Sequence, residues 1–278
     1  MRNTAKITTA VLAAGALTLG LSACGSDKGS ASSSADYSGP LVVAASPTPH
    51  AEILDYIKDN LAKKAGLDLQ VKEVTDYITP NTATEDGSVD ANYFQSQPYL
   101  DDFNAKRGTH LVSVADVHLE PLGLYSHKVK SFDALKNGAT IAVPNDADNE
   151  SRALKLLAAN GLITFKDGGK GQETPQDIAK NSKGLKFTEV EAAQTVRSLD
   201  DVDAAVVNGN YALSAGLKPA KEALVLESAK NNPYVNVLAV KKGNEKDPRV
   251  QKLTKLLTSA EVKKFIEDKY DGSVVASS

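Results

Sequence analysis

An asparagine and an arginine follow a cluster of turn-forming residues in the segment VPNDADNESRAL, residues 143–154. Asn149 is a good N-cap for the helix expected to begin there, which puts Arg152 at the third helical position. The helix macrodipole opposes a cation at that place by up to about 1 kcal/mol. A bound carboxylate would reverse this cost, because backbone N–H groups and a guanidinium would converge on it. The alternative is an exposed Arg152 that pairs with Glu150 or Asp148.

A second group of residues combines aromatic rings with short polar side chains. Such a set could form a slot for an apolar or thioether side chain of a ligand. Alternatively, two or three of the rings simply fill the core. The rings are Tyr77, Tyr93, Phe94 and Tyr99, and the polar residues among them are Asn92, Gln95, Ser96 and Gln97.

Two further asparagines lie at or within apolar runs. Asn208 follows the run at 203–207, and ligands bind outside the carboxyl ends of strands in open α/β sheets. Asn236 lies inside the run at 235–241, where a buried amide needs hydrogen-bond partners, and a ligand ammonium could be one of them. A turn at Asn208 and an internally satisfied amide at Asn236 are the alternatives.

Signals for catalysis and for metal binding are weak. The histidines are His50, His110, His118 and His127, and they have neither the HExxH nor the HxH spacing. The sequence also has no GxSxG, no phosphate-binding P-loop and no GxGxxG motif. We therefore expect no enzyme activity, no catalytic residues, no metal site and no cofactor.

The elements that must position these residues alternate along the chain, which predicts an α/β fold with a largely parallel sheet. Strands are expected at 41–46, 67–74, 89–92, 111–125, 140–143, 185–190, 203–207, 223–227 and 235–241. Helices are expected at 49–65, 79–86, 97–106, 132–136, 149–160, 175–181, 192–198, 209–215, 248–257 and 260–269.

The first residues predict the compartment. A basic start, MRNTAK, precedes an apolar run that is too short for the roughly 20 residues of a membrane span, so residues 1–23 are typical of a signal peptide. The segment LSAC that ends at Cys24 resembles a bacterial lipobox, with Cys24 as the acylated residue. Residues 24–39 are rich in Ser and Gly, which favours a flexible tether. We expect a lipoprotein on the outer face of the cell membrane, held in the bilayer by fatty acyl chains such as palmitate.

Composition excludes several other classes. Cys24 is the only cysteine, so no disulfide is expected within the chain. The formal net charge of the 278 residues is −3, which gives no reason to expect nucleic acid as a partner.

Several stretches, in collinear order from about Val42 to the C-terminus, resemble the NlpA lipoprotein family, the methionine-binding lipoproteins that feed ABC importers. They are TPHAEIL, DYITPN, DANYFQSQPYL, LYSHKVKSFDALKNGA, VPNDADNESRAL, RSLDDVDAAVVN and NPYVNVLAVKKG. The resemblance implies a two-lobed periplasmic-binding-protein fold of type 2, with the ligand in the cleft between lobes. One lobe would comprise 40–121 and 234–278, and the other 122–233. The chain would cross between the lobes near Glu120–Gly123 and Asn231–Tyr234.

The resemblance also implies a ligand and partners. The ligand would be L- or D-methionine, a closely related amino acid or a short peptide, and the partners would be a membrane permease and its ATPase subunits. Arg152 would hold the ligand carboxylate, with polar contacts from Asn149, Asn208 and Asn236. The remaining ligand-binding residues would be Tyr77, Phe94 and Tyr99 around the thioether chain, together with Ser96.

Ser96 departs from the family pattern, which commonly has His in the FQHQPY position. A hydroxyl in place of a ring leaves room for water or for a different ligand side chain, which puts strict methionine preference in doubt. Two alternative functions remain. One is a zinc or manganese receptor lipoprotein that uses some of His50, His110 and His118 with a carboxylate, and the other is a structural surface lipoprotein.

Overall fold

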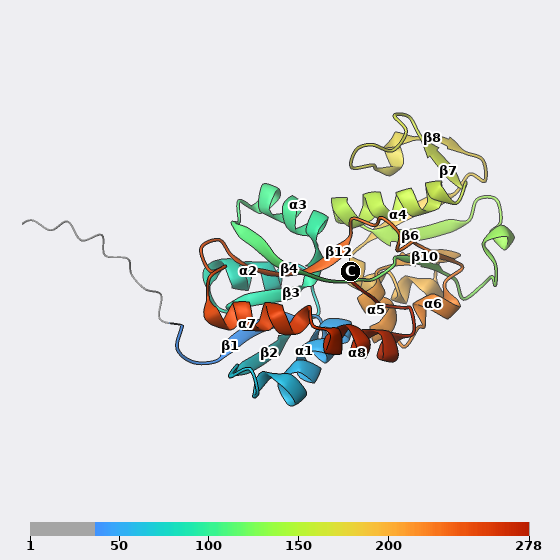
Figure 1. The fold of residues 1–278 in the computed structure, drawn as a ribbon. Helices are drawn as coiled ribbons and strands as arrows, with labels where there is room; N and C mark the ends of the chain where they lie inside the picture. Colours follow the sequence, from blue (N-terminus) through green and yellow to red (C-terminus); the bar gives the residue numbers. More distant parts are fainter. Residues whose placement is uncertain (1–36, 278) are drawn as a thin grey trace, which may run out of the picture. The chain divides into compact units, whose positions relative to one another are not determined.

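The computed structural model describes residues 37–277, which form two mixed β-sheets covered by helices (Figure 1). The predicted signal peptide, Cys24 and the tether up to residue 36 lie outside the described residues. The α/β fold class is confirmed.

The first sheet has six strands in the order β13-β4-β12-β3-β1-β2. At one end of this sheet β3, β1 and β2 pair in parallel, whereas β12 pairs antiparallel with both β3 and β4. The strands are β1 (Leu41–Ala45), β2 (Leu69–Glu73), β3 (Ala91–Ser96), β4 (Leu111–Leu119), β12 (Val235–Lys241) and β13 (Val275–Ala276).

The second sheet has five strands in the order β11-β5-β10-β6-β9, and β7 and β8 form a separate antiparallel pair. The pairs β10-β6 and β6-β9 are parallel, and β5 runs antiparallel to β10 and β11. The strands are β5 (Gly123–Tyr125), β6 (Thr140–Pro144), β7 (Ile163–Phe165), β8 (Ile178–Asn181), β9 (Lys186–Val190), β10 (Ala204–Val207) and β11 (Val225–Leu226).

The expectation of a largely parallel sheet is wrong. In the first sheet β4 and β12 pair antiparallel with each of their neighbours, and in the second sheet β5 does the same. These are the strands next to the passages between the two sheets. The chain leaves the first sheet at the end of β4 and enters the second at β5, across residues 120–122. It returns across residues 227–234, between β11 and β12. Pro121 stands in the first passage and cannot donate to a strand ladder, which explains why the single strand expected at 111–125 is interrupted.

Eight α-helices are described between residues 37 and 277. They are α1 (Glu52–Ile57), α2 (Thr79–Asp86), α3 (Gln97–Arg107), α4 (Ala147–Ala159), α5 (Gly209–Ser214), α6 (Pro219–Glu222), α7 (Pro248–Leu257) and α8 (Ala260–Tyr270). A wider π-helical turn at Lys58–Ala62 follows α1, and the segment Pro47–Ala51 before α1 is kinked at Thr48, whose backbone is extended. Short 3₁₀ helices occupy Phe132–Ala134, Pro175–Asp177, Ala192–Gln194 and Arg197–Asp200.

The helix expected at 175–181 is a second wrong prediction. Thr174 and Asp177 form a capping box that begins a helical turn, but the turn ends after Asp177. The following residues, Ile178–Asn181, have too few apolar side chains to bury a helix face, and they pair with β7 as strand β8 instead.

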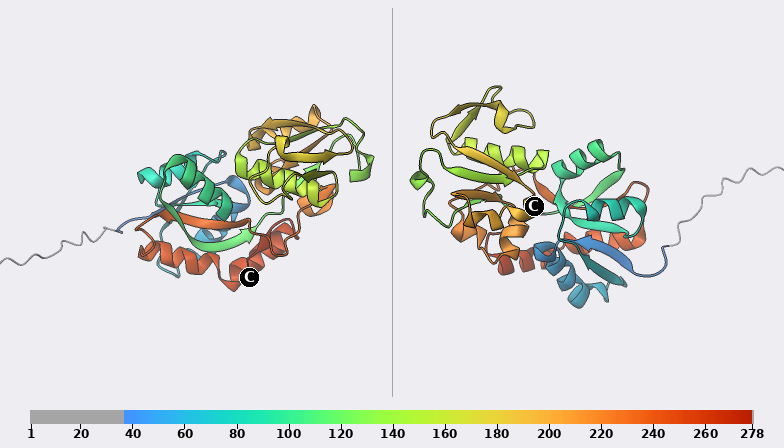
Figure 2. Two further views of the ribbon diagram at one scale, coloured as in Figure 1. Left: turned by 90° about the horizontal axis from the view of Figure 1, so that it is seen from above. Right: turned by 180° about the vertical axis from the view of Figure 1, so that it is seen from behind.

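Each sheet has its own apolar core. In the first, side chains of α1, α7 and α8 pack against β1, β3 and β12. In the second, Leu154 and Leu157 of α4 are fully buried against residues of β6 and β10. Figure 2 shows α7 and α8 along one side of the first sheet and α4 beside the second. These cores fix the ends of β3, β4, β10 and α4, from which the polar side chains described next project.

Candidate functional site

Residues from both sheets line one pocket. The space in it that no atom fills is about 360 Å³, part of which is open to solvent. All eight side chains predicted to bind a ligand are among its lining residues. The lining comprises Tyr77, Phe94, Gln95, Ser96, Tyr99, Glu120, Asn149, Arg152, Asn208, Gly209, Asn210 and Asn236. Their proximity is therefore established, and their roles in binding stay a prediction.

Helix α4 begins two residues earlier than expected. Asp146 is the N-cap, and its Oδ1 accepts a hydrogen bond from the Asn149 backbone N–H at 3.0 Å. The prediction that Asn149 caps the helix is therefore wrong, and Arg152 lies in the second turn rather than the first. The helix macrodipole at the first turn therefore gives no reason to expect an anion beside Arg152. The role of Arg152 has to be read from the residues that contact it.

Arg152 is buried, with 5% of its surface exposed, and its main partner is Glu227. Its Nε donates to Glu227 Oε1 at 3.1 Å, and its Nη2 donates to Glu227 Oε2 and to the Glu120 carbonyl at 2.9 Å. Its guanidinium also stacks on the Tyr234 ring, 4.2 Å from the centroid. Burial opposes the charge, but the adjacent Glu227 carboxylate raises the pKa of Arg152.

The alternative of an exposed Arg152 paired with Glu150 or Asp148 is wrong. Glu227 occupies the fork formed by Nε and Nη2, which a ligand carboxylate would otherwise use. Among residues 37–277, no hydrogen bond is made by Nη1. This nitrogen is the part of Arg152 that remains for a ligand.

Two amides form a chain from the helix cap into the pocket. Asn149 donates through Nδ2 to Asp146 Oδ1 at 2.9 Å, and Asn208 donates through Nδ2 to Asn149 Oδ1 at 2.7 Å. The chain orients Asn208 so that its Oδ1 is buried with no partner among the described residues. Because a buried acceptor without a donor is costly, Asn208 Oδ1 is ready to accept a hydrogen bond from a ligand.

We expect Asp146→Ala to lower the free energy of unfolding by about 1 kcal/mol, the usual value of a lost N-cap, and also to weaken ligand binding because Asn149 loses its acceptor. Urea denaturation and calorimetric titration with methionine measure the two effects. Ser259 caps α8 outside the pocket lining, and its hydroxyl accepts from the Val262 N–H. The matched Ser259→Ala should lose stability without losing affinity, and equal affinities in both variants would contradict the role given to Asp146.

Three aromatic rings form the apolar wall of the pocket. The Tyr77 ring centroid lies 5.8 Å from that of Phe94 and 5.7 Å from that of Tyr99. Tyr99 donates its hydroxyl hydrogen to the Tyr77 carbonyl at 3.0 Å, and Tyr77 donates to Asn210 Oδ1. Tyr93 is fully buried outside the lining, so for this ring the alternative of core filling is correct.

The polar residues among these rings have separate roles. Asn92 and Gln97 do not line the pocket, because Asn92 bonds Thr84 and Asn81, and Gln97 bonds Asp101. Ser96 lines the pocket and caps α3, where its hydroxyl accepts from Tyr99 N–H at 3.4 Å. Ser96 therefore supports the aromatic wall as well as leaving space in it.

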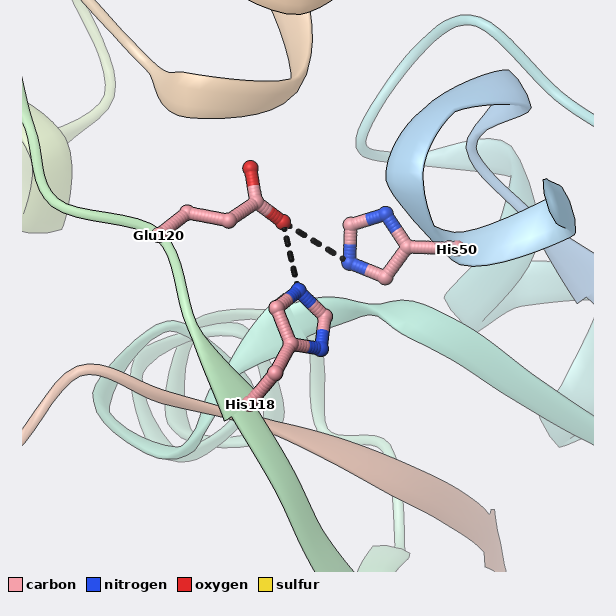
Figure 3. Close-up of side chains that lie close together, drawn as sticks. All are labelled: His50, His118 and Glu120. Atoms are coloured by element: carbon pink, nitrogen blue, oxygen red, sulfur yellow. Dashed lines mark hydrogen bonds and ion pairs between the residues drawn. The ribbon is translucent and has the colours of Figure 1, made fainter. Parts of the chain in front are cut away.

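A carboxylate that sequence reasoning missed lies at the floor of the pocket. Glu120 Oε1 is 2.8 Å from His118 Nε2 and 3.2 Å from His50 Nε2, and Figure 3 shows both imidazoles pointing at this one oxygen. His50 Nε2 is also 3.0 Å from Asn236 Oδ1, and His118 Nδ1 contacts the Tyr93 hydroxyl. We call His50, His118 and Glu120 the imidazole–carboxylate cluster. The sequence signal that could have revealed Glu120 was the segment HLE, residues 118–120, at the end of β4.

Burial dominates the ionisation of this cluster. It lowers the pKa of His50 to about 4, despite the opposing effect of Glu120, and the pKa of His118 to about 3. Burial also raises the pKa of Glu120, while His50, Arg152 and the Asn210 backbone N–H act in the opposite direction. Both imidazoles are therefore neutral near pH 7.

The cluster is also the group of described residues that could hold a metal ion. His110, the third histidine considered for such a site, lies instead at Glu85, with 3.5 Å between His110 Nδ1 and Glu85 Oε1. Of the histidines proposed for a metal receptor, the structure brings together His50 and His118 and excludes His110.

Comparison with known proteins decides the family. Residues 41–278 match the family model described as NlpA lipoprotein. The chain belongs to the NlpA lipoprotein family.

A curated NlpA relative, the methionine-binding lipoprotein MetQ of Bacillus subtilis, is 42% identical over 259 residues, which cover 92% of this chain and 93% of MetQ. A nutrient-binding protein from Burkholderia cenocepacia, solved bound to methionine, is 46% identical with a TM-score of 0.82 and covers 86% of this chain and 100% of its own. An ABC transporter periplasmic substrate-binding protein from Coxiella burnetii is 41% identical with a TM-score of 0.81, and the match covers 85% of this chain and 100% of that protein. The two-lobed binding-protein fold expected for NlpA lipoproteins is confirmed by these neighbours.

NlpA relatives include membrane lipoproteins, such as TpN32 of Treponema pallidum. Across residues 37–277, none of the helices combines the length and apolar character needed to cross a bilayer.

Proposed function

We propose that this NlpA lipoprotein is the substrate-binding component of an ABC importer and that it binds methionine, of either hand, or a closely related amino acid or short peptide. The observation that carries the proposal is the division of the pocket into a charged and amide-rich part and an aromatic wall. The former includes Arg152, Glu120 and Asn208, and the latter Tyr77, Phe94 and Tyr99. An α-amino acid with an apolar thioether side chain has the same division.

Each predicted residue has a chemically suitable role. The Nη1 of Arg152 would donate to the ligand carboxylate, and the unpartnered Asn208 Oδ1 would accept from the ligand ammonium. Three aromatic rings would surround the thioether, because sulfur makes favourable contacts with the edges of aromatic rings. The methionine-bound relative at 46% identity supports the choice of this side chain.

The proposal includes membrane anchoring and delivery. Cys24 would carry the lipid that holds the protein on the outer face of the membrane, and the ligand-bound form would dock on a permease driven by ATPase subunits. A ligand that contacts residues carried by both sheets would favour the arrangement in which the sheets approach each other, and its differential affinity sets how far that equilibrium moves. In this proposal the protein binds and releases its ligand without changing it chemically, so we assign no catalytic residue.

The metal-receptor alternative has the imidazole–carboxylate cluster in its favour. Ligating histidines usually donate the other ring N–H to an acceptor, and a metal on Nε2 would move the His50 proton to Nδ1. That nitrogen is buried with no partner among the described residues. We therefore favour an organic ligand over a metal ion for this pocket.

Thermal melting of the mature protein in detergent micelles, with amino acids, methionine dipeptides and divalent metal ions each added separately, tests the function. Ligands that bind the folded state raise the melting temperature. We expect methionine to give the largest shift among the amino acids. Stabilisation by zinc or manganese alone would support the metal receptor, and no shift with any compound would support a structural lipoprotein.

A further inference from the structure

The Tyr77 ring is held by helix α5, which follows a strand of the second sheet. Tyr77 itself lies between β2 and α2, in a segment without regular structure, so tertiary contacts must fix its ring. Tyr77 donates its hydroxyl hydrogen to Asn210 Oδ1, and the Tyr211 ring centroid lies 5.1 Å from that of Tyr77. The Tyr211 hydroxyl also donates to the Thr75 carbonyl at 3.0 Å. Two consecutive residues of α5 therefore clasp the segment that carries Tyr77.

A second cavity, which we call the outer chamber, lies behind the aromatic wall of the ligand pocket. Tyr77 and Tyr99 line both spaces, so these two rings separate them. The space in the outer chamber that no atom fills is about 1040 Å³, part of which is open to solvent. Its lining combines charged residues with four aromatic rings, those of Tyr77, Tyr99, Phe103 and Tyr211. Such a lining can receive the end of an apolar side chain.

Tyr211 supports the Tyr77 ring from the side of the outer chamber. It lines the chamber and is absent from the lining of the ligand pocket. It also packs against the apolar core around β10 in the second sheet, so its ring cannot withdraw without leaving that core. A ligand that presses on Tyr77 from the pocket therefore meets a ring that is held from behind.

We propose that Tyr211 is a positioning residue that limits the length of the ligand side chain, because it holds the Tyr77 ring as a partition between the ligand pocket and the outer chamber. This inference rests on the proposed function, in which the aromatic wall receives the end of the thioether chain. A side chain longer than that of methionine collides with the supported ring. Without the Tyr211 ring, Tyr77 turns toward the chamber, and the end of a longer, uncharged S-alkyl chain follows it.

Isothermal titration calorimetry of the mature protein in detergent tests the inference with methionine, ethionine and S-butylhomocysteine, which differ only in the length of the S-alkyl group. One additional methylene in an apolar pocket changes affinity by about 10- to 200-fold. We expect wild type to bind ethionine at least about 10-fold more weakly than methionine, and S-butylhomocysteine more weakly still. In Tyr211→Ala the ratio of methionine to ethionine affinity should fall toward one, and S-butylhomocysteine should bind more tightly than it binds wild type.

The ratio compares two ligands on the same folded protein, so a loss of stability alone does not change it. Tyr211→Leu keeps more of the packing against the second core and should lower the ratio even if Tyr211→Ala does not fold. Tyr211→Phe retains the supporting ring and loses only the hydrogen bond to the Thr75 carbonyl, so it should keep the wild-type ratio.

Tyr56→Ala is the matched control for the loss of a tyrosine ring. Tyr56 stacks on Phe265, with 4.1 Å between the ring centroids, and lines neither the ligand pocket nor the outer chamber. This variant should lose stability and keep the wild-type ratio of methionine to ethionine affinity.

Equal affinity of wild type for methionine and ethionine would overturn the inference, because the pocket would then set no length limit, while methionine binding would still uphold the proposed function. A wild-type ratio in folded Tyr211→Ala or Tyr211→Leu would overturn it in the same way. If wild type bound none of the three ligands, the inference and the proposed function would both fall.

Discussion

Arg152→Ala is expected to weaken methionine binding by about 2–5 kcal/mol, because the ligand carboxylate would be buried without its charge partner. Calorimetric titration measures the change. The variant also leaves the Glu227 carboxylate unpaired, since Arg152 donates to both of its oxygens. Melting curves recorded without ligand separate this loss of stability from the loss of affinity.

Two companion variants divide the roles of Arg152. Lys155 lies one turn later on α4, where it is half-buried outside the pocket lining and donates to the Gly171 carbonyl, so Lys155→Ala should leave affinity unchanged. Glu227→Gln weakens the ion pair but keeps the guanidinium, and we expect it to lose stability and to retain most of the affinity. Near-wild-type affinity in folded Arg152→Ala would remove Arg152 from the ligand site.

The sequence placed Arg152 at the pocket correctly but for the wrong local reason. The stretch 143–154 predicted a helix start, yet the true cap, Asp146, differs from the expected Asn149 by three residues. Asp, Asn and Ser are nearly equivalent as caps, so a segment that contains several of them does not reveal which one caps. The position of Arg152 in the pocket follows from its partner Glu227, 75 residues away.

Elements with strong local patterns were the easiest to predict. Helix α2 at 79–86, helix α7 at 248–257 and strand β12 at 235–241 have the expected bounds. Strand β8 could not be predicted in this way, because its partner β7 supplies the pairing and neither strand has a buried alternating face.

The pocket shows the same limit. The eight predicted residues were recognisable as residue types that suit a ligand, and all eight line the cavity. Glu120 was not, since an acid after an apolar strand ordinarily faces solvent. Its burial depends on His50, which the chain brings from 70 residues earlier, and on the Asn210 backbone, so only the folded structure shows a carboxylate enclosed by neutral donors.

Gly209→Ala is the second substitution with a large expected effect. Gly209 is the first residue of α5, directly after Asn208, where alanine would ordinarily suit a helix. A Cβ at this position would lie 2.7 Å from Glu120 Cβ and 2.8 Å from Glu120 Oε2. Because the imidazoles hold Glu120 from the other side, the carboxylate cannot withdraw easily, and we expect a loss of about 1–3 kcal/mol in the free energy of unfolding.

The same substitution should also weaken methionine binding, because relief of the clash would turn Glu120 away from the position that its hydrogen bonds define. Urea denaturation and calorimetry measure the two effects. Gly171→Ala is the matched control: its Cβ would meet only Glu173 Oε1, at an ordinary 3.6 Å, so stability and affinity should stay close to wild type. If Gly209→Ala behaved like this control, Glu120 would be free to move, and a rigid carboxylate at the floor of the pocket would be excluded.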